Sequence, residues 1–231
     1  TNTSSTPVAA IWADRSLDAY AAVLAALLRG FAYVPLNPKF PTERNRYILE
    51  RSGASVVIHS QVGDLDNGLI PQDGETTATL PRQILTNNLP PELPPARQHD
   101  NPYAYVLFTS GSTGQPKGVA IRHSNLGAYL DATFQVADYT HLDRLSQTFD
   151  LTFDLSAHDM FVCWRAGAEL VVPSTQDLER PAQYITDNQI TCWFSVPTLA
   201  QKMRLQGDLG QAALSSLRLS LFCGEALPVD L

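Results

Sequence analysis

Short apolar runs alternate with helical segments at the start of the chain, and this alternation most narrows the folds that the chain can adopt. Residues 8–13, 31–36 and 55–60 are apolar runs typical of buried strands. Residues 17–29, rich in Ala and Leu, predict a helix between the first two strands, and residues 42–52 predict a second helix. Strand, helix, strand, helix, strand is the pattern of a parallel sheet covered by helices.

A second series of strands and helices follows a long Pro-rich connection. Residues 61–102 hold seven of the sixteen prolines and predict an irregular stretch with room for one short strand. Later strands are predicted at residues 103–108, 119–121, 144–148, 168–172, 191–196 and 217–223, and later helices at 124–137, 155–165, 180–188 and 197–205. Ser16 and Ser124 are expected to cap the helices that follow them. We predict an α/β chain of two αβ lobes with mainly parallel sheets covered by helices: a first α/β segment over residues 1–60, the connection over 61–102 and a second lobe over 103–231.

Composition and charge exclude several classes of protein. Apolar residues make up 44% of the chain, which excludes global disorder. The formal net charge of −7 argues against a nucleic-acid partner held by phosphate neutralisation. The longest apolar run, residues 19–28, is well short of the ~20 residues that a membrane helix needs, and residues 1–7 carry no signal-peptide pattern. The three cysteines lack C-x-x-C spacing, which predicts reduced thiols. We expect a cytoplasmic protein with no nucleic-acid and no membrane partner.

The sharpest chemical signal is a Gly/Ser/Thr loop in the segment YVLFTSGSTGQPKG, residues 105–118. Gly111 and Gly114 let the backbone approach a ligand closely, and successive N–H groups in such a turn form a concave nest for anions. The hydroxyl side chains of the loop are Thr109, Ser110, Ser112 and Thr113. Lys117 adds a cation, and no carboxylate lies nearby in the sequence. The loop therefore predicts a polyphosphate clamp.

Other phosphate motifs do not match this loop. A Walker P-loop requires G-x-x-x-x-G-K-[ST], but Pro116 stands five residues after Gly111, and Gly118 follows the lysine. The dinucleotide fingerprint G-x-G-x-x-G and the nucleophile elbow G-x-S-x-G are both absent. The remaining alternative is an ordinary flexible Ser/Gly loop, against which the flanking strand and the P-K-G run both argue.

At these residues the chain resembles the adenylate-forming (ANL) superfamily, whose phosphate-loop signature is similar to residues 105–118. Residues 32–44, AYVPLNPKFPTER, resemble a segment typical of amino-acid adenylation domains of nonribosomal peptide synthetases, with Asn37 where Asp is commoner. The runs FDLSAHDMF at 153–161 and FCGEAL at 222–227 follow in the family's order. The resemblance implies the fold of part of the large N-terminal domain of an adenylate-forming enzyme.

The resemblance also implies roles for individual residues. The loop would bind the β- and γ-phosphates of ATP through Thr109, Ser110, Gly111, Ser112, Thr113, Gly114 and Lys117. Asp154 would pair with the α-ammonium of an amino acid. The substrate pocket would be lined by Leu155, His158, Phe194, Leu221 and Cys223. The adenine would lie against Gly224, Glu225 and Ala226.

Several of these residues have plainer interpretations. Asp150 also follows a Phe, but the run LSxxDMF continues only from Asp154. Asp154 could be an acid that stabilises a helix N-terminus. His158 could contact a polar or acidic substrate side chain, or simply be a satisfied helix histidine. Glu225 taken alone would be a surface charge.

The resemblance implies that ATP and an amino acid form aminoacyl-AMP, which is passed to the phosphopantetheine thiol of a carrier protein. A magnesium-contacting acid and the other catalytic parts are expected after Leu231, so no metal site is predicted in this chain. We expect the chain to need the remainder of the adenylation domain and to be inactive alone. The alternatives are an acyl- or aryl-CoA ligase of the same superfamily, against which Asp154 and the AYVPLNP run argue, and a non-catalytic fragment.

Overall fold

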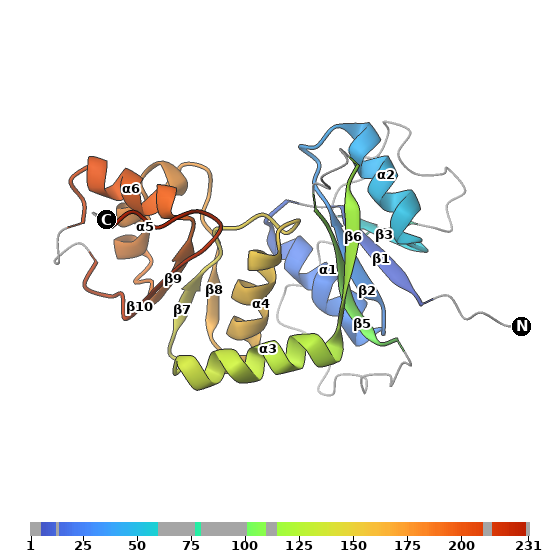
Figure 1. The fold of residues 1–231 in the computed structure, drawn as a ribbon, viewed down its shortest axis with the longest axis horizontal. Helices are drawn as coiled ribbons and strands as arrows, with labels where there is room; N and C mark the ends of the chain where they lie inside the picture. The colour runs from blue at the N-terminus through green and yellow to red at the C-terminus, as the bar shows by residue number, and fades with distance from the viewer. Residues whose placement is uncertain are drawn as a thin grey trace, which may run out of the picture. The chain divides into compact units, whose positions relative to one another are not determined.

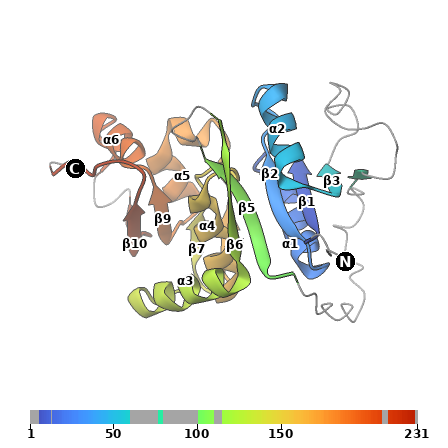
Figure 2. The ribbon, with the colours of Figure 1, turned by 45° about the vertical axis from the view of Figure 1, so that its right-hand side comes forward.

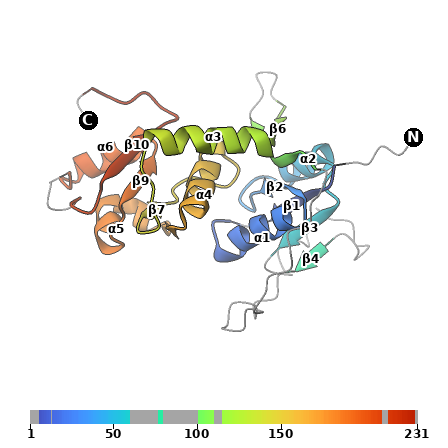
Figure 3. The ribbon, with the colours of Figure 1, turned by 90° about the horizontal axis from the view of Figure 1, so that it is seen from below.

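The computed structural model describes residues 6–12, 14–59, 77–79, 101–109, 115–209 and 214–229. The chain forms two compact units, Thr1–Tyr129 and Leu130–Leu231 (Figure 1). The helices and strands of the first unit are β1 (Val8–Trp12), α1 (Leu17–Leu28), β2 (Ala32–Leu36), α2 (Thr42–Ser52), β3 (Val56–His59), β4 (Thr77–Thr79), β5 (Tyr103–Thr109) and β6 (Lys117–Arg122). The long helix α3 (His123–Val136) contains the boundary between the units (Figure 3).

The first unit is built on a six-stranded sheet in the order β4-β3-β1-β2-β5-β6. All neighbouring strands are parallel except β5 and β6, which form an antiparallel pair. Alternate residues of a strand point to opposite faces, and β1 and β2 are buried on both. Val8, Ala10 and Trp12 pack with Ile48 of α2. Chain connections across a parallel sheet are right-handed, so α1 covers the opposite face.

The strand β5 corrects the predicted division of the chain. We expected residues 103–108 to open the second lobe, but β5 pairs in parallel with β2, with Tyr33 opposite Tyr105, and belongs to the first sheet. The rings of these two tyrosines also pack together, with their centroids 5.5 Å apart. The short strand β4 lies within the connection, where one short strand was expected.

The second unit is built on a four-stranded parallel sheet in the order β10-β9-β7-β8. Its elements are β7 (Arg144–Ser146), α4 (Asp154–Ala166), β8 (Glu169–Val171), the 3₁₀ turn η3 (Asp177–Glu179), α5 (Pro181–Asp187), β9 (Cys192–Ser195), α6 (Pro197–Leu205) and β10 (Leu219–Phe222). Helix α4 lies on one side of this sheet, and α5 and α6 lie on the other (Figure 1). On the latter side, Trp193 packs in a core with Tyr184 and Met203. The sheet thus confirms the predicted parallel architecture.

The ends of the helices test the predicted caps. Ser16 caps α1 as expected, since its hydroxyl accepts a hydrogen bond of 3.3 Å from the N–H of Ala19. Gly53 ends α2 with a positive φ of 64°, which suits a residue without a Cβ. The predicted cap at Ser124 is wrong, because α3 already begins at His123. Asn125, two residues into the helix, instead accepts from the N–H of Arg122.

Two further expectations concern membranes and thiols. Among the described residues, no helix combines the length and apolar character that crossing a membrane requires. All three cysteines are free: Cys163 and Cys192 are buried, and Cys223 is exposed. The prediction of unpaired thiols is confirmed.

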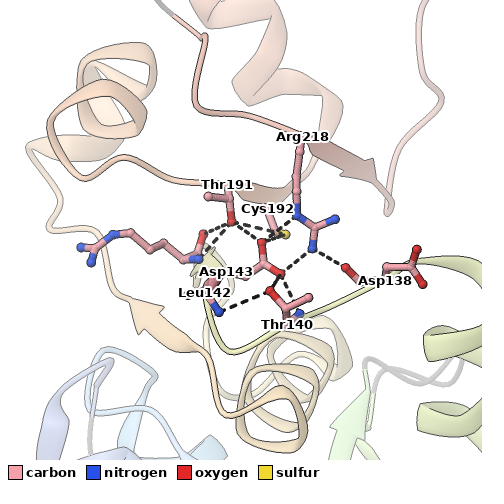
Figure 4. Close-up of polar contacts among 8 residues, drawn as sticks. Asp138, Thr140, Leu142, Asp143, Thr191, Cys192 and Arg218 are labelled. Carbon is pink, nitrogen blue, oxygen red and sulfur yellow. Dashed lines mark hydrogen bonds and ion pairs between the residues drawn. The ribbon is translucent and has the colours of Figure 1, made fainter.

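A buried carboxylate joins the amino-terminal ends of three parallel strands (Figure 4). Asp143, Thr191 and Arg218 immediately precede β7, β9 and β10. Thr191 Oγ1 and Arg218 Nε each donate to Asp143 Oδ1 at 2.7 Å. Thr140 N donates to Asp143 Oδ2 at 2.8 Å. Burial acts to raise the pKa of Asp143, but hydrogen bonds from Arg218, Thr191 and Thr140 outweigh it and hold the pKa well below its ordinary value.

We predict that Asp143→Asn lowers the free energy of unfolding by about 3 kcal/mol, because it leaves part of a buried hydrogen-bonded ion pair unmatched. The pKa of Asp143 is lower in the folded state, so its contribution is present above its unfolded pKa of ~3.9 and is lost as the pH falls toward the folded value. Urea denaturation between pH 3 and 7 measures both effects. The control is Asp131→Asn, which removes an exposed ion pair with Arg165 and should cost less than about 1 kcal/mol. Equal losses of unfolding free energy in the two variants would contradict the role of Asp143 in a buried, stabilising ion pair.

Candidate functional site

The carboxyl ends of β7, β9 and β10 meet at one edge of the second sheet, since all three strands are parallel. Residues 147–154, 196–198 and 223–226 follow these ends (Figure 2). In the strand order β10-β9-β7-β8, the chain leaves β7 toward one side of the sheet and leaves β9 toward the other side. The boundary between β7 and β9 is therefore a topological switch point, where open α/β sheets bind ligands. All the site residues that we predicted in this unit come from this edge, from the last residues of its strands or from α4.

Asp154 is the first residue of α4 and is exposed. The alternative, Asp150, is engaged locally: its Oδ1 accepts from Thr152 N at 2.9 Å and from Thr152 Oγ1 at 2.6 Å. Within the described part of the chain, no side chain forms an ion pair with Asp154. The position at a helix N-terminus stabilises a carboxylate there, as the plainer interpretation requires, but leaves its oxygens open to a cationic ligand.

His158 lies four residues after Asp154 on α4, so the two are about one helical turn apart, and it forms an aromatic wall with Phe149 and Phe194. His158 and Phe194 pack edge to face with centroids 4.8 Å apart, and Phe149 and Phe194 do so at 5.0 Å. His158 is 7% exposed and Phe194 9%. Leu221 lies opposite Phe194 in the register of β9 and β10, so it extends the same face. The structure thus brings together three of the five predicted pocket residues.

His158 is held in its neutral form by this packing, because burial lowers its pKa from 6.5 to about 4. Its ring also contacts Tyr139, with the centroids 6.3 Å apart. A neutral imidazole among aromatic rings does not provide a positive charge for an acidic side chain. Of the two predicted pocket residues outside the aromatic packing, Leu155 is half-buried on α4 and Cys223 is exposed just beyond β10.

The predicted adenine segment is fastened to α6. Thr198 donates to Glu225 Oε2 through its backbone N, at 3.1 Å, and through its hydroxyl. Glu225 is therefore not merely a surface charge, since it caps the N-terminus of α6 and holds residues 223–226 against it. Gly224 has a φ of 86°, a conformation that L side chains rarely adopt. Ala226 is exposed beside them.

The predicted phosphate loop joins β5 to β6 in the first unit. Thr109 ends β5 and lies directly opposite Lys117, the first residue of β6. Both side chains are exposed. The other predicted loop residues, Ser110, Gly111, Ser112, Thr113 and Gly114, lie outside the described residues. The described ends of the loop therefore show a closed hairpin base with a hydroxyl and a cation side by side.

A hollow of about 670 Å³ borders this hairpin base. It is lined by Lys117 and by Arg51 and Tyr47 of α2, among others. Arg51 gives the hollow a second cation that our motif search missed, because α2 is about sixty residues away in sequence. Thr198, which donates to Glu225, and Thr148, whose hydroxyl donates to the carbonyl of Phe194, were missed for a related reason. Each contacts a residue distant in sequence, and neither belongs to a motif.

The described residues do not form a metal site. No group of three or more His, Cys, Asp or Glu side chains that could hold a metal ion occurs among them.

Comparisons with known proteins agree with the geometry. A family model described as "AMP-binding enzyme" matches residues 3–231. The chain is 33% identical, over 231 aligned residues, to an L-proline--[L-prolyl-carrier protein] ligase of Pseudomonas fluorescens, across 95% of this chain and 46% of that protein.

Two solved structures are similar in fold and sequence. One is the Vibrio cholerae adenylation domain AlmE in complex with glycyl-adenosine-5'-phosphate, with a TM-score of 0.78, 30% identity and coverage of 96% of this chain and 46% of that one. The other is an AMPPNP-bound form of the nonribosomal peptide synthetase FmoA3, with a TM-score of 0.81, 27% identity and coverage of 97% and 24%. The chain spans about half the length, or less, of the relatives it matches.

We predict that the free energy of unfolding of the second unit falls by up to about 3 kcal/mol as the pH drops from 6.5 to about 4. In this pH range the histidine is protonated in the unfolded state, whereas buried His158 stays neutral in the folded state. The pKa of His158 is lower in the folded state, so full stability is present above 6.5. His158→Phe keeps an aromatic ring and should flatten this dependence. Urea denaturation of both proteins across this pH range measures it, and an unchanged slope in the variant would contradict the burial of a neutral imidazole.

Proposed function

Because the chain belongs to the AMP-binding enzyme family, we propose that the complete domain that carries it activates an amino acid. In this reaction a carboxylate oxygen of the amino acid attacks the α-phosphorus of ATP, pyrophosphate leaves, and aminoacyl-AMP forms. The aminoacyl group then passes to the phosphopantetheine thiol of a carrier protein. We also propose that the protein is cytoplasmic, as the sequence leads us to expect.

One observation carries the choice of an amino acid as substrate: an exposed carboxylate beside a buried aromatic wall. Asp154 supplies a negative charge for the α-ammonium, while Phe194 and Leu221 supply an apolar face for the side chain. A buried ammonium without a partner would be costly, so a site that excludes water from the side chain needs such a carboxylate. An acyl- or aryl-CoA ligase has no ammonium to pair, and Asp154 would then serve no ligand.

The nucleotide contacts follow from the two other motifs. Backbone N–H groups and hydroxyls of the loop from Thr109 to Lys117 would hold the β- and γ-phosphates, and charge-assisted hydrogen bonds of this kind are strong. The adenine would lie on residues 224–226, which Glu225 fastens to α6. Negative charge grows at the α-phosphorus during attack, so donors fixed in place beforehand lower the barrier. The similarity to an AMPPNP-bound structure supports ATP as the nucleotide.

We predict that Asp154→Ala, made in the complete domain, lowers the efficiency of amino-acid activation by roughly two to four decades. The bound amino acid would bury the pair between its ammonium and Asp154, and loss of one partner of a buried charge pair costs ~3–5 kcal/mol. Amino-acid-dependent ATP–pyrophosphate exchange measures this loss. Asp18→Ala is the matched control, because Asp18 occupies the first turn of α1 and its removal costs only the helix-terminus interaction. Activation by Asp154→Ala within tenfold of the wild type would overturn the ammonium role.

We also predict that Cys223 is the one thiol that reacts quickly with a disulfide reagent in the native protein. Burial raises the pKa of Cys163 to about 12 and that of Cys192 to about 11, whereas Cys223 is exposed. ATP together with the cognate amino acid should slow the modification of Cys223 if it lies in the substrate pocket. The Cys223→Ser variant is the control and should show no fast phase. Equal rates with and without substrates would remove Cys223 from the pocket.

A further inference from the structure

Asp159 is a buried carboxyl group to which the motifs assign no role. It lies one residue after His158 on α4 and is 1% exposed. Burial raises the pKa of Asp159 well above its ordinary value. Its Oδ2 has no hydrogen-bond partner among the described residues. A buried polar atom without a partner is rare and costs about 1–3 kcal/mol, so its presence calls for an explanation.

The carboxyl group of Asp159 accepts a hydrogen bond from the backbone N–H of Thr148. Thr148 stands two residues beyond the end of β7 and is the second residue of the segment 147–153 that leads to Asp154. The hydroxyl of Thr148 donates to the carbonyl of Phe194 at 2.6 Å. Thr148 therefore ties the segment to α4 through Asp159 and to β9 through Phe194.

Other side-chain hydrogen bonds of the segment 147–153 are local, so they do not fix the position of its first residues relative to α4. Gln147 Nε2 donates to the carbonyl of Phe149 at 2.6 Å, and Ser156 Oγ donates to the carbonyl of Phe153 at 2.7 Å. Each contact orders the segment locally. The contact between Thr148 and Asp159 connects the start of the segment to the helix at its end, so it sets the span that the segment must bridge.

Packing alone does not explain an aspartate at this position. Its neighbours Met160 and Val162 are fully buried apolar residues, and a leucine of nearly the same size would fill the space without the cost of an unpartnered oxygen. The feature that a leucine cannot reproduce is an acceptor for the N–H of Thr148. The acceptor, rather than the charge or the volume, is what the position supplies.

We propose that Asp159 is a positioning residue, which holds Thr148 from inside α4 and thereby places the segment 147–153 and Asp154 for substrate binding. The identity of the ligand in this inference rests on the proposed function. The positioning of the segment is a property of the fold and is independent of that function.

Two variants of the complete domain separate the acceptor from the volume. Asp159→Asn keeps an acceptor oxygen and should hold the KM for the amino acid within about threefold of the wild type, whereas Asp159→Leu should raise that KM by about tenfold or more. The KM for ATP should stay unchanged in both, and the melting temperature of the Leu variant should equal or exceed that of the wild type. Cys163→Ala, one helical turn later, is the control for a core change and should leave both KM values unchanged.

Hydrogen–deuterium exchange of peptides that cover residues 147–153 tests the positioning without reference to catalysis. Asp159→Leu should increase exchange in these peptides by about tenfold, and Asp159→Asn should leave it near the wild-type rate. Unchanged exchange in Asp159→Leu would overturn the inference. So would a Leu variant that unfolds or that keeps the wild-type KM, because either result would assign Asp159 to the core alone.

The two proposals can fail separately. If the wild-type domain shows no amino-acid-dependent pyrophosphate exchange, the proposed function fails, while the exchange of residues 147–153 still decides the role of Asp159. If the wild type activates an amino acid and Asp159→Leu does so with unchanged KM and protection, the proposed function stands and the positioning role fails.

Discussion

The parallel pairing of β7, β9 and β10 carries three chain segments to one edge of a sheet, and the candidate site in the second unit depends on it. The register of β9 and β10 places Leu221 opposite Phe194, on the face that His158 covers. A shift of that register by one residue would turn Leu221 toward the opposite face, where Trp193 packs with α5 and α6. The aromatic wall and the apolar face would then no longer coincide. Strand register is therefore as important to this site as any single side chain.

The opposite edge of the same sheet contains the contacts that hold this register. Asp143, Thr191 and Arg218 sit immediately before three strands, and their hydrogen bonds fix where each strand begins. Parallel strands have no tight turn to define their register, since a long crossover joins each pair. A polar cluster with directional bonds can do so, because a displaced strand would leave a buried carboxylate unmatched. The candidate site and the register contacts thus occupy opposite edges of the sheet.

Local patterns in the sequence predicted the elements well, because apolar periodicity and helix-end residues act over a few positions. Ser16 caps its helix for this reason, and the strands lie within one or two residues of their expected bounds. The assignment of β5 to the first sheet could not be predicted, since it depends on pairing with β2 across some seventy residues. The same holds for Glu225 and Thr198, which are 27 positions apart. Motifs named candidate residues, but partners came only from the fold.

Two buried carboxyl groups, Asp143 and Asp159, differ in how well their oxygens are hydrogen-bonded, and the difference indicates different roles. Asp143 accepts bonds from Thr140, Thr191 and Arg218, so its charge is compensated and its pKa is lowered. Asp159 accepts from the N–H of Thr148, and its Oδ2 has no partner in the described part of the chain, so the effect of burial prevails and raises its pKa. A group selected only for stability would be expected to resemble Asp143, because an apolar residue can replace an unsatisfied one at little or no cost. The unsatisfied group lies beneath the segment that leads to Asp154, where local order matters most for a ligand. The free-energy cost of the unpartnered Asp159 oxygen is explained if the N–H of Thr148 needs a hydrogen-bond acceptor, because an apolar side chain cannot provide one.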